Sequence, residues 1–186
     1  KEQIPGEEYP FNSKLKLYIV EVKEGSKGAQ VHVSRTHPGL VKRLFELEVP
    51  EIFDGTVEIK SISREPGSRS KIAVYSNDES VDAMGACVGT KGARVQNIVN
   101  ELKNEKIDII KWSKDPKEFI SNSLSPAKVL SVDIDEENKS AKVVVDDNQL
   151  SLAIGKEGQN VRLAAKLTNW KIDIKSKSQA EKEAAL

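Results

Sequence analysis

The chain has 186 residues, 38% of them apolar, which is enough to bury a core and to form two or three small domains. The 29 basic residues balance 29 acidic ones, so a surface that attracts nucleic acid has to be local rather than a property of the whole chain. One cysteine and two histidines exclude an intrachain disulfide and a structural zinc site, and no apolar run reaches the roughly 20 residues of a membrane-spanning helix. We therefore expect a cytoplasmic protein without a metal ion or a cofactor.

Residues 1–36 are predicted to contain two strands, at 14–22 and 29–35, with a turn between Gly25 and Gly28. A two-stranded hairpin alone is only marginally stable in water. We therefore interpret residues 1–36 as the end of a larger β domain, and the chain as a fragment of a longer protein.

Residues 37–113 are predicted to form one α+β unit. Apolar residues recur at helical spacing from Leu40 to Leu47, and Pro50 should end that helix. The pattern then predicts two strands, a short helix, a longer helix and a final strand, at residues 56–63, 70–76, 83–88, 93–102 and 106–112. The element order is αββααβ.

The same order of elements returns in residues 114–176. Asp115 is a good N-cap, and Pro116 suits the first position of a helix. Two strands, two helices and a strand follow, at residues 128–134, 141–145, 149–154, 159–167 and 170–174. The sequence thus predicts two tandem αββααβ repeats, each with a three-stranded sheet covered on one face by helices.

Two polar segments border the second repeat. Only Ser113 and Lys114 link it to the first repeat. This link is too short to behave as a free coil, so we expect the repeats to be held in a fixed relation. Residues 177–186 form a polar tail with weak helical character, which we expect to be loose.

Each repeat contains a G-x-x-G loop between two helices. The first loop is GTKG at Gly89–Gly92 and the second is GKEG at Gly155–Gly158, an offset of 155 − 89 = 66. The tetrapeptide KIDI follows both loops, at residues 106–109 and 171–174, an offset of 171 − 106 = 65. A lone G-x-x-G is more often a plain turn at a helix end. Because the loop and its context repeat together, we favour a functional motif.

The two loops predict binding of a sugar-phosphate backbone. Glycine lets that backbone approach closely and permits unusual dihedral angles in the turn. The helix that follows each loop directs free N–H groups and the positive end of its dipole at a phosphate. Aromatic residues are only 5% of the chain, so we expect single-stranded bases to be read in an aliphatic groove rather than by stacking. The candidate RNA-binding residues at the loops are Gly89, Thr90, Lys91, Gly92, Arg94, Gly155, Lys156, Glu157, Gly158, Gln159, Asn160 and Arg162.

Charge is unevenly distributed over the second repeat. Residues 155–175 carry five basic and two acidic side chains, 5 − 2 = +3, whereas residues 131–148 carry two basic and six acidic ones, 2 − 6 = −4. This predicts one edge that attracts RNA and one that repels it. In the second loop Glu157 puts a negative charge beside the phosphate path, so the first loop, with Lys91, should bind phosphate better.

Three basic residues flank a predicted hairpin turn at Pro66 and Gly67. For Arg64, Arg69 and Lys71 a solvated hairpin is the favoured interpretation, and a second RNA contact is the functional alternative that makes them candidate site residues.

Other reactive residues do not form a recognisable catalytic arrangement. Cys87 lies in an apolar setting with no histidine near it in sequence, so we expect a buried, inert thiol. Ser34 and His37 have neither a G-x-S-x-G turn nor an acid partner around them. We therefore expect a binding protein rather than an enzyme.

Four long stretches resemble one family of bacterial transcription elongation factors, the NusA family. They are EVPEIFDG, SREPGSRSKIAVYS, VDAMGACVGTKGARVQNIVNEL and LSLAIGKEGQNVRLAA, at residues 48–55, 63–76, 81–102 and 150–165. The likeness runs from about Ile4 to Ser176. It implies an α+β fold in which the end of an OB-type RNA-binding β-barrel domain (1–36) precedes two type II KH domains (37–113 and 114–176), with the polar tail at 177–186.

The resemblance also implies a function. The matching part of such a factor binds nascent single-stranded RNA as it leaves RNA polymerase, and so modulates pausing, termination and antitermination. The region that docks on polymerase is implied to lie before residue 1, and other transcription factors are possible partners. The alternatives are a substrate-gripping part of an RNA-processing enzyme, such as a phosphorolytic exoribonuclease, and a ribosome-associated KH protein. Both of those classes carry a single KH domain, which argues against them here.

Overall fold

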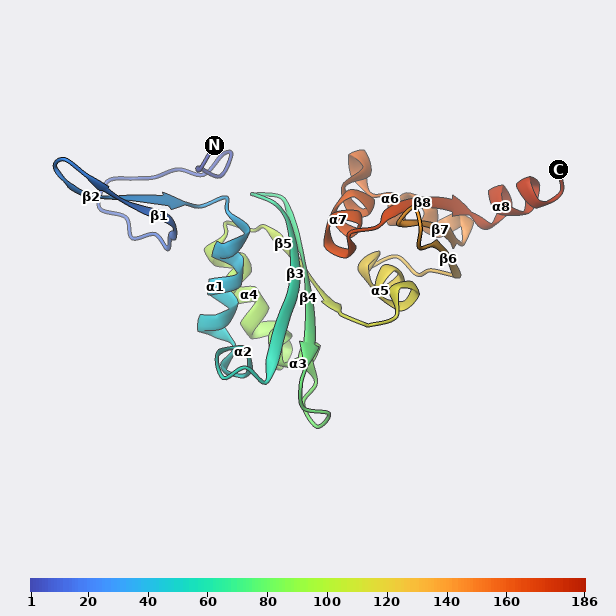
Figure 1. Cartoon of the computed structure of the whole chain (residues 1–186), viewed down its shortest axis with the longest axis horizontal. Coiled ribbons are helices and arrows are strands. Elements are labelled where there is room, and N and C mark those ends of the chain that lie inside the picture. The colour runs from blue at the N-terminus through green and yellow to red at the C-terminus, as the bar shows by residue number, and fades with distance from the viewer. The chain divides into compact units, whose positions relative to one another are not determined.

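The computed structural model describes residues 1–186, and they form two compact units (Figure 1). The first unit holds most of residues 1–107. The second holds Asp108–Leu186 together with the middle of two earlier strands, Lys60–Ser63 and Lys71–Tyr75. None of the helices combines the length and the apolar character that crossing a membrane requires.

The chain begins with a β-hairpin. Strands β1 (Tyr18–Gly25) and β2 (Gly28–Ser34) pair antiparallel, with Gly25 opposite Gly28 at the turn. This confirms two strands joined by the predicted turn, although β1 begins at Tyr18, four residues after the predicted start. The assignment of residues 1–36 to an OB-type domain stays a prediction.

A buried arginine attaches the first 36 residues to the first repeat. The Arg35 side chain is 2% exposed, and its Nη2 lies 2.7 Å from Oε1 of Glu7, which is 1% exposed. Its Nη1 donates to the carbonyl of Lys16, and its Nη2 donates to the carbonyl of Glu101 at the end of helix α4 (Ala93–Glu101). Moving the segment away would leave Arg35 as a buried charge without its acid partner, which is strongly unfavourable. The contacts of Arg35 with Glu7, Lys16 and Glu101 therefore hold the first 36 residues against α4.

The first repeat has the predicted order of elements. One short helix, α2, was not predicted. It begins at Pro50, which was expected only to end α1, and proline is well suited to the first position of a helix. Strands β3, β4 and β5 form one three-stranded sheet in that order. The elements, besides α4, are α1 (Pro38–Glu48), α2 (Pro50–Phe53), β3 (Val57–Glu65), β4 (Arg69–Ser76), α3 (Ala83–Val88) and β5 (Lys106–Lys111).

The second repeat matches its prediction as closely. Asp115 caps its first helix by accepting a hydrogen bond from the Lys117 amide, and Pro116 is the first helical residue. In its sheet β6 pairs antiparallel with β7, and β7 pairs parallel with β8. The elements are α5 (Pro116–Ser123), β6 (Ser131–Asp135), β7 (Ser140–Val145), α6 (Leu150–Ile154), α7 (Gln159–Thr168) and β8 (Lys171–Ser176).

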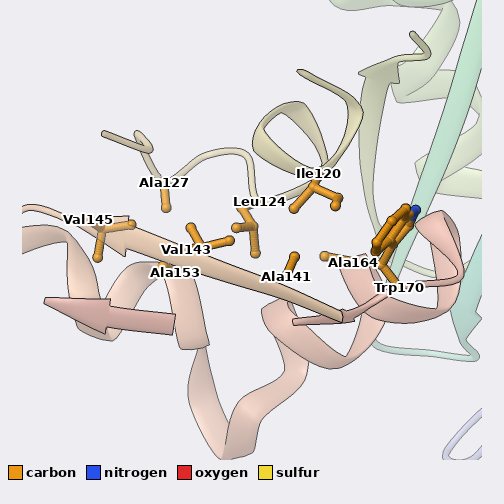
Figure 2. Close-up of a cluster of buried hydrophobic side chains, with 9 residues drawn as sticks. All are labelled: Ile120, Leu124, Ala127, Ala141, Val143, Val145, Ala153, Ala164 and Trp170. Carbon is orange, nitrogen blue, oxygen red and sulfur yellow. The ribbon is translucent and has the colours of Figure 1, made fainter. Parts of the chain in front are cut away.

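The core of the second repeat lies between β7 and the three helices. Alternate residues of β7 point inward, as the period of two along a strand requires. Figure 2 shows these strand residues gathered with side chains from the helices and from the chain after α5. Trp170, 8% exposed, is part of this cluster. The members are Ile120, Leu124, Ala127, Ala141, Val143, Val145, Ala153, Ala164 and Trp170.

The predicted loose tail is instead a helix, α8 (Lys177–Ala184). Ser176 and Gln179 form a capping box in which each side chain bonds the other's backbone amide. The backbone amide and hydroxyl of Ser178 both donate to the Asp147 carboxylate, and these hydrogen bonds lower the pKa of Asp147. The tail is therefore attached to the second repeat just before α6.

Candidate nucleic-acid interface

The first G-x-x-G loop joins α3 to α4, as predicted. Helix α3 ends at Val88, and Gly89 turns the chain with φ 76° and ψ 176°. A single 3-10 turn follows, in which Lys91 has the left-handed dihedral angles φ 54° and ψ 28°. Gly92, at φ 77° and ψ 12°, then starts α4. A non-glycine residue in the left-handed region is uncommon and strained, and such residues concentrate at functional sites.

The second loop, between α6 and α7, repeats this backbone with different residues. Gly155 has φ 79° and ψ 170°, Glu157 has φ 53° and ψ 27°, and Gly158 has φ 73° and ψ 15°. At these three positions the largest difference from the first loop is 176 − 170 = 6°, in ψ of the first glycine. The two loops are thus one structure built twice, and Glu157 takes the position of Lys91.

The two glycines of each loop are needed for different reasons. A Cβ on Gly89 would lie 2.7 Å from Cγ of Arg94, and one on Gly155 would lie 2.7 Å from the backbone nitrogen of Asn160. The first glycine is therefore required by packing inside the protein, a reason that we did not predict beside RNA approach and unusual dihedral angles. At Gly92 no atom lies within 4 Å of the added Cβ, and at Gly158 the nearest is 3.9 Å away. Only at the second glycine of each loop is the space beside the backbone open, so that a ligand could approach it there.

Each loop also offers backbone donors. In the first loop the hydrogen bonds of the 3-10 turn start with the amides of Gly92 and Ala93, which donate to the carbonyls of Gly89 and Thr90. The amides of Thr90 and Lys91 precede those bonds and belong to the residues that a helical turn leaves without an internal partner. These two residues directly precede the N-terminus of the nine-residue helix α4, where the helix dipole is positive. An anion is favoured at this position.

The exposed loop side chains differ in charge. Thr90 and Lys91 are exposed in the first loop, and Lys156 and Glu157 are exposed in the second. Arg162 is also exposed, and its Nη1 donates to the carbonyl of Glu157 at 2.9 Å, so an arginine lies against the second loop. The positive charge of Arg162 offsets the negative charge of Glu157. The second loop is therefore less disfavoured for phosphate than its sequence alone indicates.

Arg94 is less available than predicted. Its Nη1 donates to the carbonyl of Ala86 at 2.7 Å and to the Glu51 carboxylate at 2.9 Å. The side chains of Arg94 and Glu51 are 30% and 32% exposed. Glu51 is 43 residues away in sequence and shares no motif with the loop, so no local pattern could have revealed this partner.

Asn160 was predicted to contact RNA, and the structure corrects this. It is 1% exposed, and its Nδ2 donates to the carbonyls of Leu124 and Ala153 at 3.0 and 2.9 Å. It therefore supports the second loop from inside the protein. Asn160 stands five residues after the first glycine of its loop, as Arg94 does in the first loop. The neighbouring Gln159 is half-buried and remains a candidate RNA-binding residue.

The predicted hairpin contact is also corrected, because two of its three basic side chains are buried. Arg64 makes an ion pair of 3.1 Å with Glu105, and both side chains are 0% exposed. Nζ of Lys71 donates to the Asp108 carboxylate at 2.9 Å and to the carbonyl of Ser125.

Such pairing is what makes burial of charge tolerable. It depends on residues 41 and 37 positions away, so the sequence around the turn did not show it. Of the three, only the half-buried Arg69 remains a candidate.

Cys87 lies in α3, directly before the first loop, and is fully buried. Burial raises the pKa of its thiol to about 12, and the nearby Glu51 carboxylate adds to the rise. A thiol that stays protonated is a poor nucleophile. No group of three or more histidine, cysteine or acidic side chains that could hold a metal ion comes together anywhere in the chain.

Both repeats match known domain families. The family described as the NusA-like first KH domain matches residues 35–112, and the NusA-like second KH domain matches residues 116–182. The chain belongs to the NusA family. The two αββααβ repeats are therefore KH domains, and the G-x-x-G loops lie at the same place in each of them.

Curated NusA relatives cover nearly the whole chain. Proteins named transcription termination/antitermination protein NusA from Halalkalibacterium halodurans, Bacillus subtilis and Thermus thermophilus are 63%, 64% and 52% identical to it. The matches cover 97%, 96% and 100% of this chain but 47%, 48% and 48% of the relatives. The chain thus spans about half the length of the curated NusA relatives it matches.

A solved structure shares the fold. The chain titled "Crystal structure of APE1850" matches with a TM-score of 0.52 and 23% identity, over 73% of this chain and 95% of that one. At this level of identity the likeness concerns the fold alone.

Proposed function

We propose that the two KH domains bind single-stranded RNA through the paired G-x-x-G loops, each loop holding the sugar-phosphate backbone. The observation that carries this is that two loops of different sequence have the same backbone angles, to within 6°, at both glycines and at the residue before the second glycine. In both loops the second glycine leaves an open surface at the positive end of a helix. Lys91, Lys156 and Arg162 supply charge, and Arg69 and Gln159 remain secondary candidates.

The family and the names of its members suggest the setting. We propose that the RNA is a nascent transcript and that its binding contributes to pausing, termination and antitermination in the bacterial cytoplasm. RNA polymerase and other transcription factors would then be partners of the full-length protein. In this proposal the chain's role is binding without catalysis.

A length series of single-stranded RNA oligonucleotides tests the proposal directly. A KH domain holds about four nucleotides, so affinity should rise up to about eight nucleotides or more when both loops bind. Each phosphate contact should lower log K by about 0.7 per log unit of salt. A double-stranded RNA of equal length should bind more weakly, because paired bases cannot enter a KH groove. Affinity that stops rising at four or five nucleotides would show that only one loop binds.

A charge reversal identifies the surface. Lys91→Asp should weaken binding, because it places a negative charge at the start of α4, and aspartate tolerates the left-handed conformation there better than most residues. Lys103→Asp is the matched control, since Lys103 is also exposed and left-handed, with φ 55°, but lies beyond the other end of α4. Equal losses from both changes would count against the loop as the binding site.

A further inference from the structure

The first loop has an acidic neighbour that the second loop lacks. Glu51, in α2, accepts a hydrogen bond from Nη1 of Arg94, the residue five positions after the first glycine of the loop. The equivalent position in the second loop holds Asn160, which is uncharged and buried. The two loops thus share a backbone but differ in the charges beside it.

Arg94 does not depend on Glu51 for its position. Its Nη1 also donates to the carbonyl of Ala86 at 2.7 Å, near the end of α3. Its aliphatic stem runs beside Gly89, where an added Cβ would lie 2.7 to 3.0 Å from the stem carbons. The Ala86 carbonyl and the packing against Gly89 therefore hold the guanidinium beside the loop even when the Glu51 carboxylate is removed.

Arg94 keeps donors for a ligand. Its Nε and Nη2 have no hydrogen-bond partner within the protein, and its side chain is 30% exposed. The Nε and Nη2 edge of a guanidinium is suited to a phosphate, which it can bind through two parallel hydrogen bonds. What opposes a phosphate at this place is the Glu51 carboxylate, 2.9 Å from Nη1 and itself 32% exposed.

We propose that Glu51 lowers the RNA affinity of the first KH domain by partly neutralising Arg94, so that the carboxylate on Nη1 opposes an RNA phosphate on the Nε and Nη2 edge of this arginine. The proposal rests on the proposed function and adds to it a residue that weakens binding. A pair exposed to this extent is weak, because solvent screens it and holding it costs side-chain entropy. A phosphate can therefore bind the Nε and Nη2 edge beside the carboxylate, whose negative charge weakens this contact without preventing it.

The test is Glu51→Gln, measured by titration of a single-stranded RNA of about eight nucleotides at several salt concentrations. Glutamine keeps the shape and can still accept a hydrogen bond from Arg94, so the fold is preserved. RNA should bind about two- to fivefold more tightly, the range expected from the loss of one surface ion pair. The dependence of log K on log salt should steepen by up to about 0.7, the change expected when one more positive charge is free to neutralise a phosphate.

Two controls separate this effect from a general change of charge. Glu46→Gln removes another glutamate, which pairs with Arg43 in α1 at 2.7 Å, and should leave binding unchanged. In an Arg94→Met background, which keeps the stem beside Gly89, Glu51→Gln should no longer tighten binding. Circular dichroism checks that each variant is folded.

The outcomes are distinct. Wild-type protein that binds no RNA would refute the proposed function and the role of Glu51 with it. If wild-type protein binds and Glu51→Gln neither tightens binding nor steepens the salt dependence, the proposed function stands and the role of Glu51 is wrong. Equal tightening by Glu46→Gln, or tightening that persists without Arg94, would also overturn it.

Discussion

Replacing Glu157 by lysine in the second loop should turn a phosphate-repelling position into an attracting one. Glu157 and Lys91 have the same backbone conformation, φ 53° and ψ 27° against φ 54° and ψ 28°, so lysine fits without a change in the turn. The carbonyl of Glu157 still accepts the hydrogen bond from Arg162, because that contact is to the backbone. The substitution therefore changes charge by two units and little else.

The size of the effect follows from the position of the charge. A unit charge about 7 Å from a phosphate contributes about 0.6 kcal/mol in water, so a change of two units contributes about 1.2 kcal/mol. Screening at physiological salt, with a Debye length of about 8 Å, reduces this to about 0.5 kcal/mol. RNA should therefore bind about two- to eightfold more tightly, with the larger factor at low salt.

Fluorescence anisotropy with a labelled oligonucleotide of about eight nucleotides, repeated at low and physiological salt, measures this change. Lys91→Glu in the first loop should weaken binding by a similar factor, and thermal unfolding of both variants should stay close to that of the wild type. Unchanged affinity for Glu157→Lys beside a clear loss for Lys91→Glu would show that phosphate does not reach the second loop.

Two further predictions concern stability. Gly89→Ala should destabilise the fold by about 1 to 3 kcal/mol in urea denaturation, because its Cβ collides with the Arg94 stem at positive φ, whereas Gly92→Ala should cost only about 1 kcal/mol for its left-handed backbone; equal losses would contradict the separate roles of the two glycines. The pKa of Cys87 is raised in the folded protein from 9.0 to about 12, so the folded state keeps its proton where the unfolded state loses it. The free energy of unfolding should fall as pH rises above 9, by up to about 1.4 kcal/mol per pH unit, and the part due to Cys87 should be absent in Cys87→Ala. Alanine fits there, because Ala153 fills the equivalent position in the second repeat; the same pH dependence in both proteins would refute the assignment.

Periodicity, turn residues and capping residues were enough to predict both repeats. Most strand and helix ends lie within one to three residues of the predicted ends, because Pro116, Asp115 and the loop glycines mark them locally. The paired loops were found because they repeat. Helix α8 was missed although its signal was present: Ser176 followed three residues later by Gln179 is a capping box.

The sequence did not show which polar and charged side chains are buried. Arg64, Lys71 and Asn160 look like surface residues because each stands beside a turn or a loop. Their partners Glu105, Asp108 and Leu124 lie 41, 37 and 36 residues away and come into contact only through the tertiary fold. Glu51 escaped notice for the same reason. Long-range pairing, and not local pattern, decides whether a basic residue faces a ligand.

The identity of the two loop backbones has a consequence for how the protein can change. Since TK and KE are both accommodated between the same two glycines, the middle residues can be exchanged without moving the helices on either side. Exchanging GTKG and GKEG between the two loops would keep the composition and the net charge of the chain constant, while altering which domain is expected to bind RNA more tightly. The four side chains between the loop glycines can thus change the relative RNA affinity of the two KH domains, and selection can act on them while the fold stays the same.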